Sequence, residues 1–169
     1  MLTLAALMFL STILLNFYGL LADTGDDIAT GQDGILATTF ATSYMELANG
    51  LSFDEVTDTS DIAIQNVGAL TPVGSLGPES AAEDSIHKFN DFDDFKGFQT
   101  EKEIGGTSRR FRATFDVNYV NPSNVTINSS SRTYVKRLDV KIWRTFPAAN
   151  GARLDTLTMS QVMGYFHFD

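Results

Sequence analysis

Acidic side chains are the residues of this sequence best suited to chemistry, and they occur in two clusters. The first, in FNDFDDFKGF, comprises Asp91, Asp93 and Asp94. The second comprises Asp54, Glu55, Asp58 and Asp61. Carboxylate oxygens are the ligands that Ca²⁺ prefers, and the ion takes about six to eight of them. Neither cluster has EF-hand spacing, so we predict no metal or cofactor and keep Asp91, Asp93 and Asp94 as the candidates should Ca²⁺ bind. Solvated loop charges are the alternative.

Catalytic motifs find little support in the sequence. The two histidines, His87 and His167, lie in no serine, cysteine or metal motif. The glycine-rich stretch GALTPVGSLG lacks the lysine and the strand-to-helix context of a phosphate-binding loop. We therefore expect that the protein is not an enzyme. Asn124 and Asn128 begin two acceptor sequons, so both are candidates for glycosylation, although such short motifs also arise by chance.

Charge is distributed unevenly along the chain. Residues 1–87 carry 12 acidic and no basic side chains, whereas residues 88–169 carry 12 basic and 9 acidic ones. The net charge of −9 argues against a nucleic-acid partner. The acidic part of one copy could instead meet the basic part of another, or it could be a solvated loop region. The chain has no cysteines, so disulfides are excluded.

An uncharged apolar segment covers residues 1–22 and is long enough to cross a bilayer as a helix, which needs about 20 residues. A secretory signal peptide would begin with basic residues and have a shorter apolar stretch. An ordinary anchor would have basic flanks. Removal of a short basic leader, leaving the apolar segment at the mature N-terminus, fits the missing flank best. Small and hydroxyl residues interrupt this segment and favour close helix–helix packing: Thr3, Ser11, Thr12, Asn16 and Gly19.

Beyond the apolar segment, the sequence predicts a second helical stretch and then a β-rich head. Residues 23–27, DTGDD, indicate a break or loosening of the helix, since Gly25 lowers helix propensity. An amphipathic stretch then covers residues 28–51 and ends near Asn49 and Gly50. The side chains expected to pack on the head are Ile35, Leu36, Phe40, Tyr44, Leu47 and Leu51. The predicted organisation is therefore a helix at residues 1–53 and a head at residues 54–169.

Alternation of apolar and polar residues predicts the strands of the head. Residues 110–120 and 132–144 both alternate and should pair as an antiparallel hairpin across a polar turn at residues 121–131. Residues 154–166 can supply another strand. Four aromatic residues spaced by three should pin an irregular segment onto the core, a ligand-stacking role being the alternative: Phe89, Phe92, Phe95 and Phe98. The expected fold is α+β, with the second half of the long N-terminal helix packed on a small antiparallel sheet.

The order of these features resembles the type IV pilin-like proteins, including minor and mannose-sensitive-haemagglutinin-type pilins and the pseudopilins of type II secretion. The residues that carry the resemblance are MLTLAALMFLSTILL, ATSYMELANGLSFDE, FDDFKGF, RFRATFDVNYVNP and RTYVKRLDVKIW. It implies a structural subunit of an extracellular helical filament, inserted in the inner membrane before assembly by pilus machinery and N-methylated at Met1. The side chains expected to pack in the filament core are Met1, Leu2, Leu4, Leu7, Met8, Phe9, Leu10, Ile13, Leu14, Leu15, Phe17, Tyr18, Leu20 and Leu21.

Two departures from the family pattern affect the expected subtype. Major pilins carry a glutamate at the fifth mature position, where this chain has Ala5, and often a proline near residue 22, where it has Ala22. The aspartates at positions 23, 26 and 27 cannot replace that glutamate, since they lie more than ~30 Å along the helix from Met1. Apolar packing would then have to set the register of subunits. A transient pseudopilin, or a membrane-anchored β domain that binds a ligand, remains as an alternative.

Overall fold

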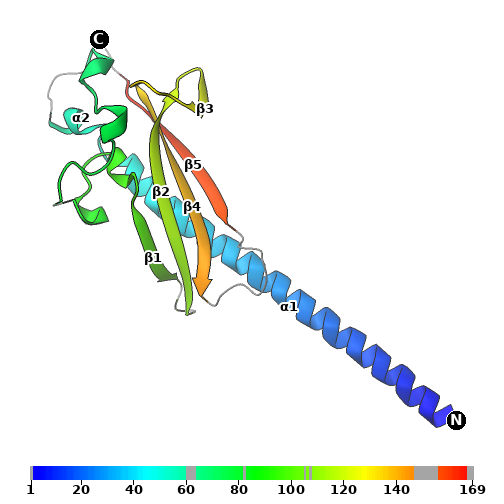
Figure 1. The fold of residues 1–169 in the computed structure, drawn as a ribbon. Helices are drawn as coiled ribbons and strands as arrows, with labels where there is room; N and C mark the ends of the chain where they lie inside the picture. Colours follow the sequence, from blue (N-terminus) through cyan, green and yellow to red (C-terminus); the bar gives the residue numbers. More distant parts are fainter. Residues whose placement is uncertain are drawn as a thin grey trace. The chain divides into compact units, whose positions relative to one another are not determined.

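The structure is a computed structural model that describes residues 2–59, 64–81, 83–104, 106, 108–146 and 156–166. The side chains of residues 2, 58 and 59 lie outside that description. The chain divides into two compact units, Met1–Leu36 and Ala37–Asp169, here called the N-terminal and C-terminal units. The expected α+β fold is confirmed, with one long helix and a five-stranded antiparallel sheet (Figure 1).

Helix α1 comprises Leu2–Asn49, coloured blue to cyan in Figure 1. It ends where the Asn-Gly signal predicted, and the Gly50 amide donates to the Leu47 carbonyl at 3.1 Å. The predicted break at residues 23–27 is wrong, because the helix continues through them. The Thr24 hydroxyl donates back to the Leu20 carbonyl at 2.8 Å, a bond within the helix, and does not cap a new one.

The N-terminal unit consists of the first part of α1, in which every described side chain from residue 3 to residue 28 is exposed. By length and composition this helix could cross a membrane, and it is the one such helix in the part of the chain that the structure describes.

The sheet in the C-terminal unit has the strand order β1-β2-β4-β5, and β3 pairs with the end of β2. Its strands are β1 Gln99–Ile104, β2 Arg109–Asn121, β3 Asn124–Asn128, β4 Val135–Phe146 and β5 Leu157–Gly164. The predicted β2–β4 hairpin and the later strand are confirmed. The sequence prediction missed β1, and it assigned the segment of β3 to a polar turn.

One face of α1 packs on this sheet within the C-terminal unit, and it combines small with large side chains. The buried residues of this face are Ala37, Phe40, Ala41, Tyr44, Met45 and Ala48. The Tyr44 ring lies 5.1 Å from that of Phe115 on β2, between centroids. Phe40 and Tyr44 are buried as predicted and Leu36 and Leu51 are half-buried, but Ile35 and Leu47 are 69% and 42% exposed, so their predicted packing is wrong. Half of this buried face therefore consists of alanines, and the other half of the larger Phe40, Tyr44 and Met45.

Short helices and loops connect α1 to the sheet. They are α2 Glu55–Thr59, η1 Val67–Ala69, η2 Val73–Ser75, η3 Ile86–Lys88 and η4 Asp93–Phe95. The predicted aromatic anchor is confirmed: Phe89, Phe92 and Phe95 are buried and Phe98 is half-buried, and the rings of Phe95 and Phe98 lie 5.6 and 5.5 Å from that of Phe115. This anchor fixes η4, and with it the aspartates around it, against the sheet.

Candidate functional site

Two chain segments distant in sequence bring the acidic residues of the C-terminal unit together. Residues 52 and 91 form a parallel bridge, in which the Phe92 amide donates to the Ser52 carbonyl at 2.8 Å. The bridge aligns the start of α2 with the segment that leads into η4. Asp54 and Glu55 therefore lie beside the aspartates at positions 91, 93 and 94, which explains how the two acidic clusters of the sequence become one.

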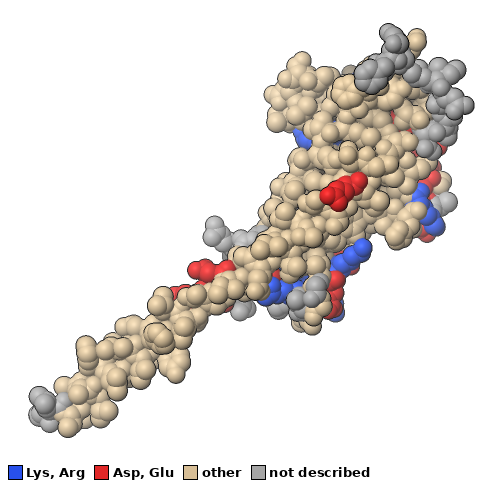
Figure 2. Space-filling model, turned by 180° about the vertical axis from the view of Figure 1, so that it is seen from behind, with Lys and Arg blue, Asp and Glu red and all other residues tan. Residues whose placement is uncertain are grey.

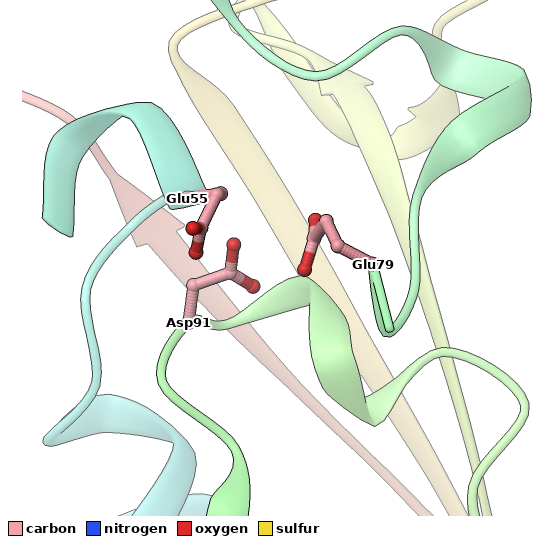
Figure 3. Close-up of side chains that lie close together, drawn as sticks. All are labelled: Glu55, Glu79 and Asp91. Carbon is pink, nitrogen blue, oxygen red and sulfur yellow. The ribbon is translucent and has the colours of Figure 1, made fainter. Parts of the chain in front are cut away.

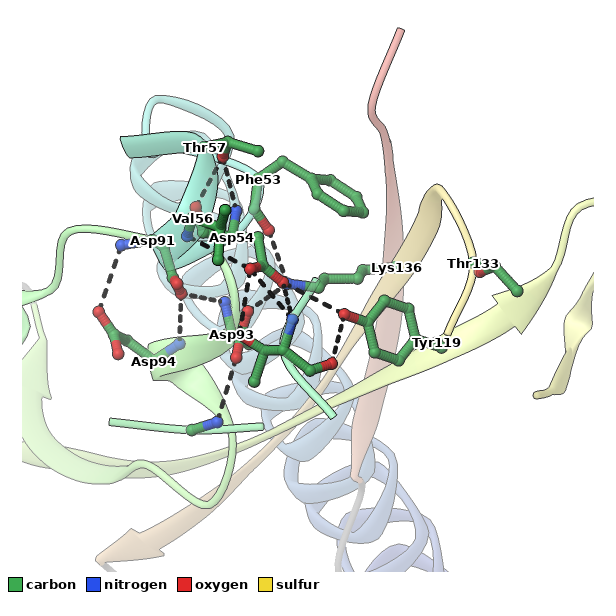
Figure 4. A network of polar contacts seen from close by, with 12 residues as sticks. Phe53, Asp54, Val56, Thr57, Asp91, Asp93, Asp94, Tyr119, Thr133 and Lys136 are labelled. Atoms are coloured by element: carbon green, nitrogen blue, oxygen red, sulfur yellow. Dashed lines mark hydrogen bonds and ion pairs between the residues drawn. The ribbon is translucent and has the colours of Figure 1, made fainter. Parts of the chain in front are cut away.

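A buried lysine on β4 neutralises part of this charge. Lys136 is 0% exposed, and its Nζ donates to the Phe53 carbonyl at 2.7 Å, to Asp54 Oδ2 at 2.8 Å and to Asp93 Oδ1 (Figure 4). An ammonium has three N–H donors, so these acceptors use all of them. The Phe53 and Tyr119 rings, 4.6 and 5.3 Å from Nζ, enclose the cation.

The pKa values of the two carboxylates paired with this lysine are shifted in opposite directions. Burial raises the pKa of Asp54, but the charge and hydrogen bond of Lys136, with the Thr71 amide 3.1 Å from Oδ2, outweigh burial and hold that pKa below its usual value. Burial dominates at Asp93 and raises its pKa, although Lys136 and the Gly77 amide oppose the shift. The shared lysine ties Asp54 and Asp93 together and so stabilises one fixed arrangement of the two segments.

Asp91 and Asp94 are buried, and one carboxylate oxygen of each has no hydrogen-bond partner among the described residues. Asp91 Oδ1 accepts from the amides of Asp93 and Asp94 at 2.8 and 3.2 Å, but Asp91 Oδ2 has no hydrogen-bond partner among the described residues. Asp94 Oδ2 accepts from the Asn90 and Asp91 amides, and its Oδ1 is likewise unpartnered there. Both residues are 0% exposed. Burial, followed by the charge of Asp93, raises the pKa of Asp91 to about 8.

Carboxylates from three separate segments meet around these aspartates. Oxygens of Glu55, Glu79 and Asp91 all lie within 4.8 Å of one another, and Figure 3 shows the three carboxylates turned towards a common centre. Glu79, Glu83 and Asp94 form a second group by the same measure. Burial of the carboxyl end, with the charges of Asp93, Asp94 and Glu55, raises the pKa of Glu79 to about 7, although the residue as a whole is exposed.

The predicted candidate ligands are only partly brought together. Asp91 and Asp94 belong to the two carboxylate groups, whereas Asp93 faces Lys136 and takes no part in either. Of the second sequence cluster, Glu55 joins a group, while Asp61 and the side chain of Asp58 lie outside the described residues.

The residues of this candidate site that sequence reasoning missed are Glu79, Glu83 and Lys136. The glutamates sit in a separate loop, with no spacing that links them to η4. Lys136 could have been noticed in the sequence, because it lies on the inward-facing side of β4 together with Leu138 and Val140.

A second candidate surface is the apolar face of the N-terminal unit. Figure 2 shows no charged atoms on the N-terminal part of α1, at the lower left, until the first acidic residues appear. The large apolar side chains exposed there are Leu4, Leu7, Met8, Phe9, Leu10, Ile13, Leu14, Leu15, Phe17, Tyr18, Leu20 and Leu21. Met1 and the Leu2 side chain, also expected in this surface, lie outside the described residues.

The remaining candidates are placed without forming a site. His87 is exposed in η3, and His167 lies outside the described residues. Asn124 and Asn128 are exposed on β3, where the side-chain oxygen Oδ1 of Asn128 accepts from the Arg137 guanidinium at 2.8 Å.

Comparison with known proteins does not identify a family for this chain. An α+β fold by itself does not imply a function. No family model, curated protein or solved structure matches the chain, so its function is argued from its own residues.

Proposed function

We propose that the protein is a structural subunit of an extracellular, type IV pilus-like helical filament that polymerises by packing the apolar part of α1 against the same segment of other copies. The observation that carries this proposal is the exposure of an uncharged helix surface. Residues 3–22 contain no charged side chain and all of them are exposed, with Phe9 at 71%.

The size of this surface requires a partner. Twelve large apolar side chains are exposed between residues 4 and 21. Burying each of them is worth about 1.5–3 kcal/mol, so leaving them all in water forgoes on the order of 20 kcal/mol. That exceeds the usual stability of a whole domain, about 5–15 kcal/mol. The segment must therefore be covered by lipid, by protein or by each in turn.

Small and polar residues in the segment favour other copies of the chain as the final partner. Gly19 has open space around the position of a side chain, so a neighbouring helix could approach closely there. The Thr12 hydroxyl donates to the Met8 carbonyl at 2.9 Å, so it adds no unsatisfied polar group to an apolar interface. With Ala5 in place of the family's glutamate, apolar packing would set the register between copies.

The same helix would insert in the inner membrane before assembly machinery transfers the subunit to a filament at the cell surface. A pseudopilin of a secretion machine would use it in the same way but assemble only transiently. A membrane-anchored ligand-binding domain would keep it in lipid permanently. Contact between the apolar segments of different copies therefore separates the two assembling functions from the anchored domain, and the abundance of the assembled chain separates the pilus subunit from the pseudopilin.

Single cysteines can test that contact, because the natural chain has none. Ser11→Cys places a thiol in the apolar segment, and the control Ser130→Cys places one at an exposed position after β3. In sheared surface material, a short bismaleimide should link Ser11→Cys copies into covalent dimers and leave the control monomeric. Electron microscopy with mass spectrometry should find the chain in filaments, N-methylated at Met1.

Two results would contradict the filament proposal. One is the recovery of the chain only in the membrane fraction with no crosslinked dimer, which would favour the anchored domain. The other is dimer formation of equal yield in the Ser130→Cys control, which would show random collision of copies.

A further inference from the structure

Three buried oxygen acceptors in one short segment lack a donor. Asp91 Oδ2, Asp94 Oδ1 and Asn90 Oδ1 have no hydrogen-bond partner among the described residues. A buried carboxylate oxygen without a partner costs free energy, which native proteins normally avoid. When the carboxyl groups are ionised, all three atoms are acceptors, so the missing group is a donor or a cation.

The nearest buried cation cannot fill this role. Lys136 directs its three N–H donors to the Phe53 carbonyl, Asp54 and Asp93, with none left for Asp91. Glu55 and Glu79 bring further negative charge to the Asp91 side chain, within 4.8 Å. Three carboxylates at this separation repel one another unless protons or a cation neutralise them.

The spacing of the carboxylates matches the coordination shell of a hard divalent cation. Ca²⁺–oxygen distances are about 2.3–2.6 Å, so two oxygens on one ion can lie up to roughly 4.8 Å apart. Oxygens of Glu55, Glu79 and Asp91 satisfy this limit in every pair. The Asp91 side chain, 0% exposed, points between the two glutamates (Figure 3).

We propose that the C-terminal unit binds one Ca²⁺ ion between Glu55, Glu79 and Asp91, with Asp91 Oδ2 as its buried ligand. This site goes beyond the proposed filament function and does not depend on it. Several carboxylates with solvent access through the exposed Glu79 suit Ca²⁺, which accepts irregular shells of about six to eight oxygens. Mg²⁺ demands near-octahedral geometry and keeps its waters, so it fits less well.

The ion would join three segments of the chain. Glu55 begins α2, Glu79 lies in the loop after η2, and Asp91 precedes η4. One contact that already holds the Glu79 loop to the rest of the unit is the Gly77 amide, which lies 3.3 Å from Asp93 Oδ2. Bound Ca²⁺ would therefore stabilise this loop and the folded C-terminal unit together.

The test uses the full chain in detergent, stripped with EDTA, dialysed and titrated with Ca²⁺ alone. Equilibrium dialysis with radioactive Ca²⁺ should give one ion per chain, with a Kd on the order of 10⁻⁴ M. Thermal unfolding followed by Trp143 fluorescence should shift upward with Ca²⁺, and less with Mg²⁺. Glu79→Gln and Asp91→Asn should each weaken binding about tenfold or more. Glu103→Gln, an exposed carboxylate on β1, is the matched control and should bind as the natural chain does.

Glu79→Gln keeps the proposal testable if Asp91→Asn fails to fold, because Glu79 is exposed whereas Asp91 is buried. The proposal is overturned if the chain shows no saturable Ca²⁺ binding up to about 10 mM, well above the expected Kd. It is also overturned if Glu79→Gln and Glu103→Gln bind equally, or if Mg²⁺ gives the same thermal shift as Ca²⁺. None of these outcomes depends on filament assembly.

Discussion

The N-terminal and C-terminal units treat charge and apolar surface in opposite ways. In the N-terminal unit, residues 3–22 carry no charge and expose every side chain. In the C-terminal unit, five charged residues are 0% exposed: Asp54, Asp91, Asp93, Asp94 and Lys136. Both arrangements are costly in an isolated soluble protein, since one leaves apolar surface in water and the other removes charge from it.

The two units offset these costs by different means, one for its exposed apolar surface and the other for its buried charge. The N-terminal unit has nothing of its own to cover its apolar side chains, so the compensation must come from outside. The C-terminal unit compensates internally at Asp54 and Asp93, through Lys136, but an oxygen of Asp91 has no partner among the residues that the structure describes. Each unit is therefore incomplete in a defined way, and each deficiency indicates the chemistry of the missing partner.

The largest effect is expected from Lys136→Met, which removes the internal compensation. The change leaves Asp54 and Asp93 buried without their cation, and breaking such a pair costs about 3–5 kcal/mol. Urea unfolding followed by Trp143 fluorescence should show this loss in the free energy of unfolding. Lys141→Met, at an exposed position of the same strand, should stay within about 0.5 kcal/mol of the natural chain.

A second variant separates lost charge pairing from lost packing. Adding Asp54→Asn and Asp93→Asn to Lys136→Met removes the unpaired charges and should recover part of the lost stability. If the triple variant is no more stable than Lys136→Met, the lysine stabilises the unit through its aliphatic packing and not through its charge.

Leu14→Asp is the corresponding change in the N-terminal unit, because it puts a charge into the uncharged surface. A carboxylate at the centre of a membrane helix costs about 2.5–3.5 kcal/mol, so binding to lipid vesicles should fall roughly 100-fold. Vesicle flotation measures the bound fraction. Leu47→Asp, on the exposed face of α1 in the C-terminal unit, should float as the natural chain does. Equal losses in both variants would mean that the surface of residues 3–22 is not what binds lipid.

The fold was predictable where local chemistry decides it. The Asn49–Gly50 helix end, the apolar segment and the alternation in β2 and β4 all follow from short-range rules. Strand β1, QTEKEI, was missed because it is an edge strand that pairs with β2 mainly through its backbone and buries little side-chain surface. The break at residues 23–27 was predicted wrongly. The prediction rested on the low helix propensity of Gly25 and did not consider that the Thr24 hydroxyl bonds to a carbonyl inside the helix.

The candidate site was less predictable than the fold, since tertiary contacts assemble it. The aspartates of FNDFDDFKGF were visible in the sequence, but which of them would face Lys136 and which would remain unpartnered depends on η4 and the bridge at residue 52. Glu79 entered through a loop whose path no periodic pattern specifies. An inward-facing lysine in an alternating strand, such as Lys136, is the one signal that would have indicated a buried acidic partner.

Ala48→Leu tests whether small side chains position α1 on the sheet. Ala48 is 0% exposed, so added volume must displace its neighbours, at a cost of about 1–3 kcal/mol. Urea unfolding should detect the loss. Ser43→Leu makes a similar enlargement on the exposed face of the same helix and should change stability by less than about 0.5 kcal/mol. A comparable cost at both positions would indicate an effect on helix propensity and not on packing.

Glu79→Gln should give the smallest effect, and its sign depends on pH. In EDTA, the folded chain raises the pKa of Glu79 to about 7, from an ordinary value of 4.5. The folded state therefore binds more protons than the unfolded state between these values, and stability falls as pH rises through this window. The variant lacks this loss, so it should match the natural chain at pH 5 and exceed it at pH 8. The gain should stay below about 1 kcal/mol, because the exposed side chain is screened by solvent.

Ca²⁺ should reverse that order at pH 8, because the natural chain binds the ion more tightly than the variant and gains more stability from it. Paired urea titrations at pH 5 and pH 8, with EDTA or with Ca²⁺, measure all four conditions. A gain of equal size at both pH values would trace the effect to amide hydrogen bonding and not to repulsion among carboxylates. The missing partner of the C-terminal unit would then concern Asp91 alone, and Glu79 would lie next to the site without belonging to it.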